Sequence, residues 1–209
     1  MKEQYGHIDF ENEKVIKIIN YAFEEFSKYS FEKASTNSIV KRAGISRGLL
    51  YHYFKDKQDL YDFLLYYSVK ITLDELDAKQ YWKEQDIFKR IKQVAISKME
   101  IAKKYPYLID FYKQIKDVDR YKKVKGEAKG HYPDLDRKFY SYNVDFSNVK
   151  DGVDIEKMVN VIKYTLEQVG RKYWEAVKEN GANFQLDDLF REYDEYIEFL
   201  KTAFYHEDS

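Results

Sequence analysis

Residues 39–60 read IVKRAGISRGLLYHYFKDKQDL, and this stretch decides the fold. Its centre is a turn between two short helices. Ala43 is small enough to let two helix backbones approach, and Gly44 is the residue type that most readily takes a left-handed backbone conformation. Ile45 is apolar and is expected to anchor the second helix to the core. The sequence therefore predicts a tight turn that depends on a glycine.

Serine residues mark the beginning of both helices. Ser35 is predicted to cap a helix over residues 36–43, because its hydroxyl oxygen can accept a hydrogen bond from a free backbone N–H group of the first turn. Ser46 is predicted to cap a second helix over residues 47–53 in the same way. Two short helices joined by such a turn are typical of a helix-turn-helix.

The helix-turn-helix segment is basic, although the whole chain has a net charge of −1. Between Lys33 and Lys57 there are six lysine and arginine residues and one acid, Asp56. Phosphate binding responds to the local field, so this patch favours a nucleic-acid backbone; a solvated surface stretch is the alternative on charge alone. Arg47 begins a helix, where the dipole favours a phosphate, and its guanidinium can also bind guanine. Gly48 permits a close approach to DNA.

Residues 15–65 resemble the N-terminal DNA-binding domain of TetR-family transcriptional regulators. The most diagnostic features are the Ala-Gly-Ile-Ser turn, the Tyr-His-Tyr-Phe run and the Lys-x-x-Leu that follows, which occur in the family's order without a gap. Two positions depart from the family pattern. Ser30 replaces a glycine that usually follows the first helix, and Ser38 replaces an acid that often completes the capping box. Neither lies in the second helix of the motif, residues 47–53, which is expected to be the recognition helix, so both concern local stability more than function.

The resemblance, together with the chemistry of the side chains, implies a set of DNA-contacting residues. Arg47 and Gly48 would face base edges. Tyr51 and His52 would contact the sugar-phosphate backbone. Tyr51 and Tyr53 are two residues apart on a helix, so at most one of them can point inward, and we expect it to be Tyr53. The predicted DNA-binding residues are Ser35, Thr36, Ser46, Arg47, Gly48, Tyr51, His52, Lys55 and Lys57.

The rest of the chain predicts an all-α fold. Only 2 prolines and 8 glycines interrupt 209 residues, and apolar residues recur at helical spacing. An N-terminal three-helix helix-turn-helix DNA-binding domain is expected over residues 1–55, and a C-terminal helical ligand-binding and dimerisation domain over residues 56–209. The stretch 117–130 has almost no apolar content and is predicted to be a mobile loop or a weak helix. Further helices are expected over residues 12–29, 57–79, 85–104, 108–115, 133–148, 155–180 and 187–205.

The resemblance implies that the C-terminal domain holds a dimer contact and an effector site. Helices near residues 155–180 and 187–205 carry strong apolar stripes, which would form a four-helix bundle with a second copy; the alternative is that they pack only within their own domain. Such a homodimer would bind a palindromic double-stranded DNA operator.

The region 80–150 is rich in aromatic residues, which suit a small-molecule site but more often form a core. The candidate ligand-binding residues are Met99, Phe111, Tyr112, Tyr142 and Tyr164.

Other classes of function lack support in the sequence. The chain has no cysteine and 4 scattered histidines, so no metal and no cofactor is predicted. No nucleophile motif or glycine-rich phosphate loop indicates an enzyme, and the acid pairs Glu24-Glu25 and Asp187-Asp188 are interpreted as solvated surface or helix-start residues. No apolar run indicates a membrane span or a signal peptide, so a cytoplasmic protein is expected.

The function that fits these predictions is a sequence-specific transcriptional regulator, a repressor that a small-molecule effector releases from its operator. The effector would move the helix over residues 57–79 as a lever. This requires that the effector bind the DNA-free state of the protein more tightly than the DNA-bound state. Two alternatives stay open. One is a helical ligand-binding adaptor without specific DNA binding, and the other is an activator in place of a repressor.

Overall fold

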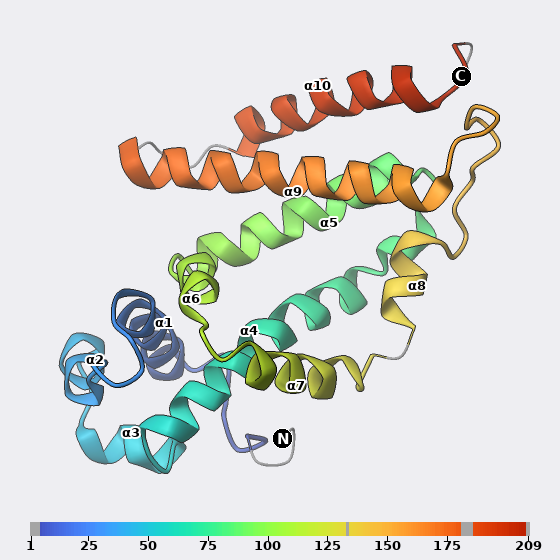
Figure 1. Cartoon of the computed structure of the whole chain (residues 1–209). Helices are drawn as coiled ribbons and strands as arrows, with labels where there is room; N and C mark the ends of the chain where they lie inside the picture. The colour runs from blue at the N-terminus through green and yellow to red at the C-terminus, as the bar shows by residue number, and fades with distance from the viewer. Residues whose placement is uncertain (1–4, 133, 181–185, 208–209) are drawn as a thin grey trace. The chain divides into compact units, whose positions relative to one another are not determined.

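The computed structural model describes residues 5–132, 134–180 and 186–207, and it confirms the all-α prediction (Figure 1). Regular β structure in the described ranges is limited to an isolated bridge between Val149 and Tyr205. No helix in these ranges is long and apolar enough to cross a bilayer. The helices are α1 Glu13–Lys28, α2 Thr36–Ala43, α3 Arg47–Tyr53, α4 Lys57–Lys79, the short 3-10 helix η1 Tyr81–Lys83, α5 Ile87–Lys104, α6 Leu108–Gln114, α7 Val118–Lys129, α8 Leu135–Tyr140, α9 Ile155–Asn180 and α10 Leu186–Phe204.

The chain divides by compactness into two units, which we describe separately. Unit 1 comprises residues 1–74 and 100–133, and unit 2 comprises residues 75–99 and 134–209. Helix α4 contributes residues to both units. This grouping differs from the functional boundary expected at residue 55, which stays a prediction.

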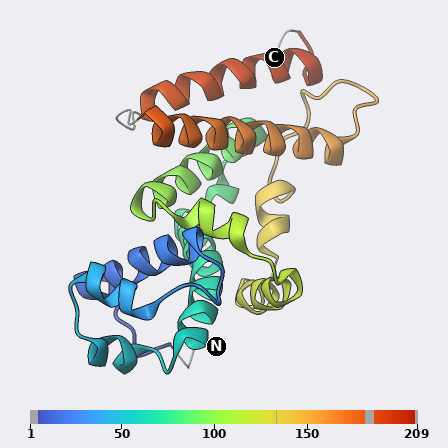
Figure 2. The same ribbon diagram turned by 60° about the vertical axis from the view of Figure 1, so that its left-hand side comes forward.

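The core of unit 1 is built on the apolar face of α1. Ile18, Ile19 and Phe23 are fully buried, because α1 packs against α2 and α6. Aromatic rings extend this core: Phe23 makes edge contacts with Tyr105 and Phe111. In Figure 2, α1, α2 and α3 are the blue and cyan helices that gather into one cluster. Burial of this apolar surface, at about 25 cal/mol per Å², holds the cluster together.

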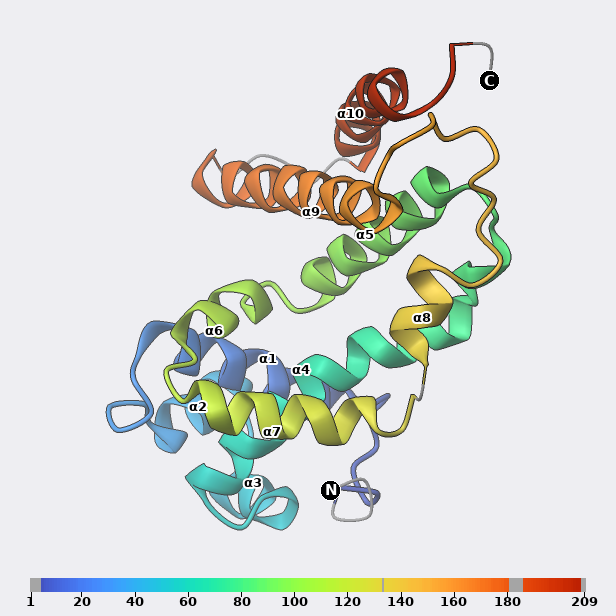
Figure 3. The ribbon, with the colours of Figure 1, turned by 45° about the vertical axis from the view of Figure 1, so that its right-hand side comes forward.

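The stretch predicted to be a loop or a weak helix forms a helix of unit 1, α7. Asp117 caps α7 by accepting a hydrogen bond from the Arg120 N–H at 2.9 Å. Val124 and Ala128, four residues apart on one face, are buried. The Arg120 side chain forms an ion pair with Asp62 of α4, and Figure 3 shows α7 running beside α4. Docking on α4 therefore supplies the stability that composition alone does not.

Unit 2 corrects the helix expected over residues 133–148. Helix α8 ends at Tyr140, and Pro133, which was expected to open the helix, lies outside the described residues. The chain after α8 is held by the fully buried guanidinium of Arg90 in α5. A buried cation must have its donors satisfied, and backbone carbonyls do this here. The accepting carbonyls are those of Trp82, Glu84, Lys138, Phe139, Tyr142 and Asn143.

Helices α9 and α10 of unit 2 pack against each other, at the positions predicted from their apolar stripes. Gly170 of α9 permits a close approach, because a Cβ at this position would lie 2.5 Å from the Tyr193 hydroxyl and 3.4 Å from the side chain of Met99. Tyr193 is fully buried, and burial raises its pKa. The missing side chain at Gly170 therefore leaves room for the hydroxyl of Tyr193 between α9 and α10.

Candidate nucleic-acid interface

The turn between α2 and α3 has the geometry that its sequence predicts. Gly44 has φ +65°, in the left-handed region where glycine is least strained. The Ile45 N–H donates to the Val40 carbonyl at 3.2 Å and closes the end of α2. The Ser46 hydroxyl accepts the Leu49 N–H at 3.1 Å and begins α3. Both ends of the turn are therefore satisfied by local hydrogen bonds.

The start of α2 is held by its own cap and by a buried acid of α1. The Ser35 hydroxyl accepts the Ser38 N–H at 3.4 Å. The carboxylate of Glu25, which is 3% exposed, accepts the Ser35 N–H and the Ser38 hydroxyl, both at 2.8 Å. An acid from a neighbouring helix therefore replaces the acid that the capping box lacks at Ser38.

Glu24 is also buried and joins α1 to α2. It forms ion pairs with Lys28 of α1, at 2.7 Å, and with Arg42 of α2. Burial by itself raises the pKa of Glu24, but hydrogen bonds from Arg42 and Lys28 hold that pKa below its ordinary value. The interpretation of Glu24 and Glu25 as solvated surface acids is wrong, because both side chains are buried and have partners within the protein.

Helix α3 exposes a polar cluster that extends onto α2. The guanidinium carbon of Arg47 lies 5.4 Å from the ring centroid of Tyr51, and the Tyr51 hydroxyl lies 3.4 Å from the Thr36 hydroxyl oxygen. Hydrogen bonds from Thr36 and Arg47 lower the pKa of Tyr51. His52 is exposed beside this cluster. Predicted contact residues from two helices therefore lie together on one surface, where Arg47 supplies a positive charge.

Neither the backbone conformation nor the packing within the protein requires a glycine at position 48. Its φ lies outside the left-handed region, and a Cβ would meet only the Ser46 hydroxyl oxygen, at 3.9 Å. The space beyond Gly48 is therefore open on the outer side of α3. The neighbouring tyrosines confirm the orientation that we predicted: Tyr53 is half-buried, whereas Tyr51 is 37% exposed.

The ammonium group of Lys57 is already engaged within the protein. It donates to the backbone carbonyls of Phe31 at 2.8 Å, Glu32 at 3.2 Å and Ala34 at 3.2 Å. An ammonium has three N–H donors, so these bonds use all of them. These bonds hold the loop between α1 and α2 and occupy the donors that were expected to contact a phosphate, and that contact stays a prediction. The side chain of Lys55, in contrast, is exposed.

Ser30, at the position where the family usually has glycine, lies in the same loop. Positive φ angles in the described residues occur at Gln80, Asp134, Asn143, Gly44 and Gly152, and Ser30 is not among them. Its carbonyl accepts the N–H groups of Lys33 at 3.0 Å and Ala34 at 2.9 Å. The serine is therefore accommodated without a left-handed backbone.

The five predicted effector-lining residues fall in both units. In unit 1, Phe111 is a core residue, and Tyr112 donates its hydroxyl to a backbone carbonyl of α4 at 2.8 Å. In unit 2, Met99 is buried near the crossing of α9 and α10, whereas Tyr142 and Tyr164 are 52% and 61% exposed. Packing accounts for Phe111, Tyr112 and Met99, so a ligand contact at any of the five stays a prediction.

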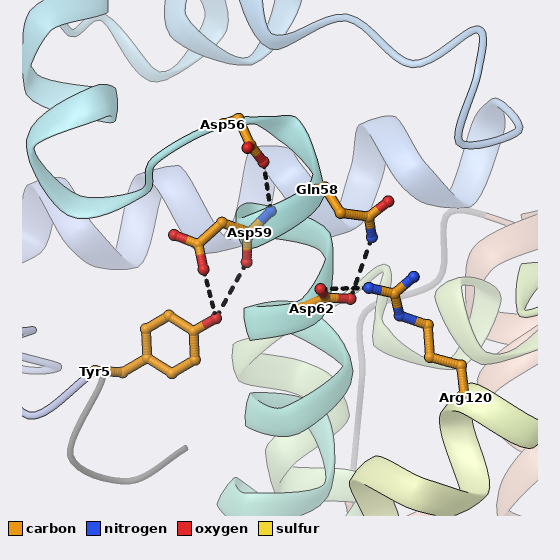
Figure 4. Close-up of polar contacts among 6 residues, drawn as sticks. All are labelled: Tyr5, Asp56, Gln58, Asp59, Asp62 and Arg120. Carbon is orange, nitrogen blue, oxygen red and sulfur yellow. Dashed lines mark hydrogen bonds and ion pairs between the residues drawn. The ribbon is translucent and has the colours of Figure 1, made fainter.

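One cleft of unit 1 has a volume of about 540 Å³ and lies between the N-terminal segment, α4 and α7. It includes Tyr5, Asp59 and the ion pair between Asp62 and Arg120 (Figure 4). The lining is mainly acidic, and the acids drawn in Figure 4 are bound to protein donors. Within the described part of the chain, no group of three or more histidine or acidic side chains is placed to hold a metal ion.

Comparison with known proteins supports the sequence resemblance. Residues 18–63 match the family described as "Bacterial regulatory proteins, tetR family". A relative from Bacillus subtilis (strain 168), the uncharacterized HTH-type transcriptional regulator YvdT, is 33% identical over 79 residues. This match covers 35% of the present chain and 41% of YvdT. The matched part of the present chain therefore spans less than half the length of YvdT.

Solved structures resemble nearly the whole chain. A TetR family transcriptional regulator from Chloroflexus aurantiacus J-10-FL has a TM-score of 0.58 at 18% identity, with 98% of each chain covered. FadR from Bacillus subtilis, in complex with stearoyl-CoA, has a TM-score of 0.56 at 17% identity, covering 88% of this chain and 96% of FadR. At these identities the likeness shows the fold alone. The chain therefore matches the tetR family of bacterial regulatory proteins over residues 18–63, and it shares the fold of these solved structures over nearly its whole length.

Proposed function

We propose that this protein is a sequence-specific DNA-binding transcriptional regulator, a repressor that leaves a palindromic operator when a small-molecule effector binds. One observation carries the proposal. Arg47 and Tyr51 are exposed and form a polar cluster with Thr36 beside Gly48, whose outer side is open. In the complex, α3 enters the major groove, Arg47 binds a guanine, and Gly48 lets the DNA approach the helix backbone.

The remaining contacts are made to the sugar-phosphate backbone. Tyr51 and His52 are exposed on α3 and carry donors for phosphate oxygens, and the exposed ammonium of Lys55 follows them. The backbone N–H groups at the starts of α2 and α3, next to Ser35 and Ser46, face the same partner. Lys57 is left out of this set because its donors bind protein carbonyls.

The operator is palindromic in this proposal because the protein binds it as a two-fold dimer. Large apolar side chains are exposed on both α9 and α10: Val161, Tyr164, Tyr196 and Phe199. Phe199 is 69% exposed, and such a surface is unfavourable in water unless something covers it. A second copy of the same two helices would cover it by forming a four-helix bundle.

The effector acts through α4. This helix begins directly after the recognition helix and contributes residues to both compact units. The solved complex of FadR with stearoyl-CoA supports a ligand site within this kind of fold. An effector that binds more tightly to the placement of α4 that does not fit the operator shifts the protein population away from DNA binding. A tenfold decrease in DNA affinity needs about 1.4 kcal/mol of difference between the effector's affinities for the two placements.

The proposal is tested by fluorescence anisotropy with duplexes that the protein selects from a random-sequence pool. The wild-type protein should bind a selected duplex much more tightly than a scrambled one, at two protomers per site and at two salt concentrations. Arg47→Ala should weaken specific binding by about 1–3 kcal/mol and relax the base preference. Lys89→Ala removes one positive charge from an exposed position of α5 and serves as the control.

The competing function is a helical ligand-binding adaptor without specific DNA binding. It predicts that no duplex is enriched by selection and that Arg47→Ala and Lys89→Ala behave alike. Equal and salt-sensitive binding to selected and scrambled duplexes would leave only a basic patch, and the regulator proposal would then be wrong.

A further inference from the structure

The segment before α1 packs on the junction between the recognition helix and α4. Tyr5 and Ile8 are buried, and the ring of Tyr5 meets Phe63 of α4 edge-on with 5.0 Å between centroids. His7 stacks with Tyr53, the last residue of α3, at 6.4 Å. Sequence patterns gave this segment no role. In the structure it contacts both helices that flank the link between residues 53 and 57.

Asp59 of α4 is the point where these parts meet (Figure 4). Its Oδ1 accepts the hydroxyl of Tyr5 at 2.8 Å, and its Oδ2 accepts the backbone N–H of Lys55 at 2.9 Å. Its own N–H donates to the side chain of Asp56 at 2.8 Å. One carboxylate therefore joins the N-terminal segment, the link after α3 and the first turn of α4.

The two oxygens of a carboxylate move together, which makes the Tyr5 hydrogen bond relevant to the link. When the Tyr5 hydroxyl fixes Oδ1, the position of Oδ2 against the Lys55 N–H is fixed as well. Burial, together with the neighbouring Asp59 carboxylate, raises the pKa of Tyr5, so the hydroxyl stays a donor. The link itself is short, and its first residue, Phe54, is buried. A rotation of Asp59 would therefore displace the Lys55 N–H, which follows the end of α3.

We propose that Tyr5 is a positioning residue for DNA recognition. Its hydroxyl holds the Asp59 carboxylate in the orientation that receives the Lys55 N–H, and this fixes the angle between α3 and α4. Tyr5 acts through Asp59 and the link, without touching a base. The inference rests on the proposed function, because it concerns how accurately α3 is presented to a specific duplex.

The test is Tyr5→Phe in the full chain, which removes the hydroxyl and keeps the ring on Phe63. We expect affinity for the selected duplex to fall about tenfold, since a hydrogen bond to a charged group is lost. Affinity for a scrambled duplex should stay unchanged, because nonspecific binding depends on phosphate charge and not on the angle of α3. Hydrogen exchange at the Lys55 amide should become faster, and this second readout needs no DNA.

Tyr105→Phe is the matched control. It removes the hydroxyl-to-hydroxyl bond between Tyr105 and Tyr67, which is 2.6 Å long, buried in unit 1 and separate from the hydrogen bonds of Asp59. It should lower the melting temperature and leave the ratio of specific to nonspecific affinity unchanged. Asp59→Asn should lower this ratio as Tyr5→Phe does, and the two changes together should lower it no further than either alone.

The possible outcomes separate the inference from the function on which it rests. If the wild-type protein does not prefer its selected duplex, the proposed function fails. If the wild-type protein shows the preference and Tyr5→Phe keeps it, Tyr5 does not position α3. A parallel loss of specific affinity, nonspecific affinity and melting temperature in Tyr5→Phe would make Tyr5 a residue of general stability and would also overturn the inference.

Discussion

The carboxylate of Glu25 in α1 accepts a hydrogen bond from the hydroxyl of Ser38 in α2 at 2.8 Å. The same carboxylate accepts the Ser35 N–H, so it fixes where α2 begins. We expect Glu25→Gln to lower the free energy of unfolding by about 1–3 kcal/mol, because the amide replaces one buried acceptor with a donor. Glu100→Gln, at an exposed position of α5, is the control. Urea unfolding measures both, and equal stability of the two variants would contradict this role of Glu25.

Gly48→Ala should separate stability from DNA binding. A methyl group at this position has room within the protein, and alanine favours helix, so the free energy of unfolding should stay unchanged or rise by up to about 1 kcal/mol. Affinity for the selected duplex should fall by about tenfold, because overpacking a close interface costs about 1–3 kcal/mol. Gly126→Ala, at an open position of α7, should leave affinity unchanged. Retained affinity in Gly48→Ala would show that DNA does not approach α3 at this residue.

Lys55 and Lys57 should behave differently although they are two residues apart. Lys55→Ala removes an exposed cation, so the slope of log affinity against log salt should decrease by about 0.9 for one lost phosphate contact. Lys57→Met should leave the slope unchanged and lower the melting temperature, because it frees the carbonyls of Phe31, Glu32 and Ala34. A reduced slope in Lys57→Met would restore this lysine to the phosphate contacts that the family resemblance implies.

The ion pairs of Glu24 should make stability depend on pH. The pKa of Glu24 in the folded protein lies below its ordinary value of 4.5, so Glu24 stabilises the fold above that pH. Its contribution is lost as the pH falls through the folded pKa. The difference in unfolding free energy between the wild-type protein and Glu24→Gln should therefore be largest near neutral pH and shrink below pH 4.5. A difference that stays constant across this range would exclude a paired, ionised Glu24.

Phe199→Glu should disrupt the proposed dimer without unfolding the protomer. The side chain is 69% exposed on α10, so the folded protomer does not need its apolar surface, whereas a bundle of two copies would bury it. Sedimentation velocity should show a dimer for the wild-type protein and a monomer for Phe199→Glu. Tyr29→Glu, at an exposed position of unit 1, should remain dimeric. The proposed interface is wrong if Phe199→Glu sediments like the wild-type protein.

The helix-turn-helix could be predicted almost residue by residue, because local interactions define it. The caps Ser35 and Ser46 and the left-handed Gly44 act within a few residues of themselves, and the structure has them as predicted. The long apolar stripes of α9 and α10 were predictable for the same reason, since helical spacing is a local property. The set of residues expected to contact DNA followed from residue type and position in this motif, and it stays a prediction.

The sequence did not determine whether α7 forms or where α8 ends. In both cases, contacts with residues elsewhere in the chain decide the structure. α7 carries little apolar surface, and it forms because Arg120 and Val124 dock in unit 1. Helix α8 ends early, where the chain that follows it turns and its Tyr142 and Asn143 carbonyls accept hydrogen bonds from Arg90. Both outcomes depend on contacts between residues that are dozens of positions apart, and periodicity within a segment does not contain them.

The sequence by itself determined the helix-turn-helix, the helices with long apolar stripes and the residue types that are expected to contact DNA. Only the tertiary structure decided which charged groups are free to act: Glu24 and Glu25 are buried against α2, and Lys57 is bound to backbone carbonyls, whereas Arg47 and Lys55 remain exposed. The physical reason is that a charge is solvated or paired according to what packs over it, and that depends on segments brought together only by the fold.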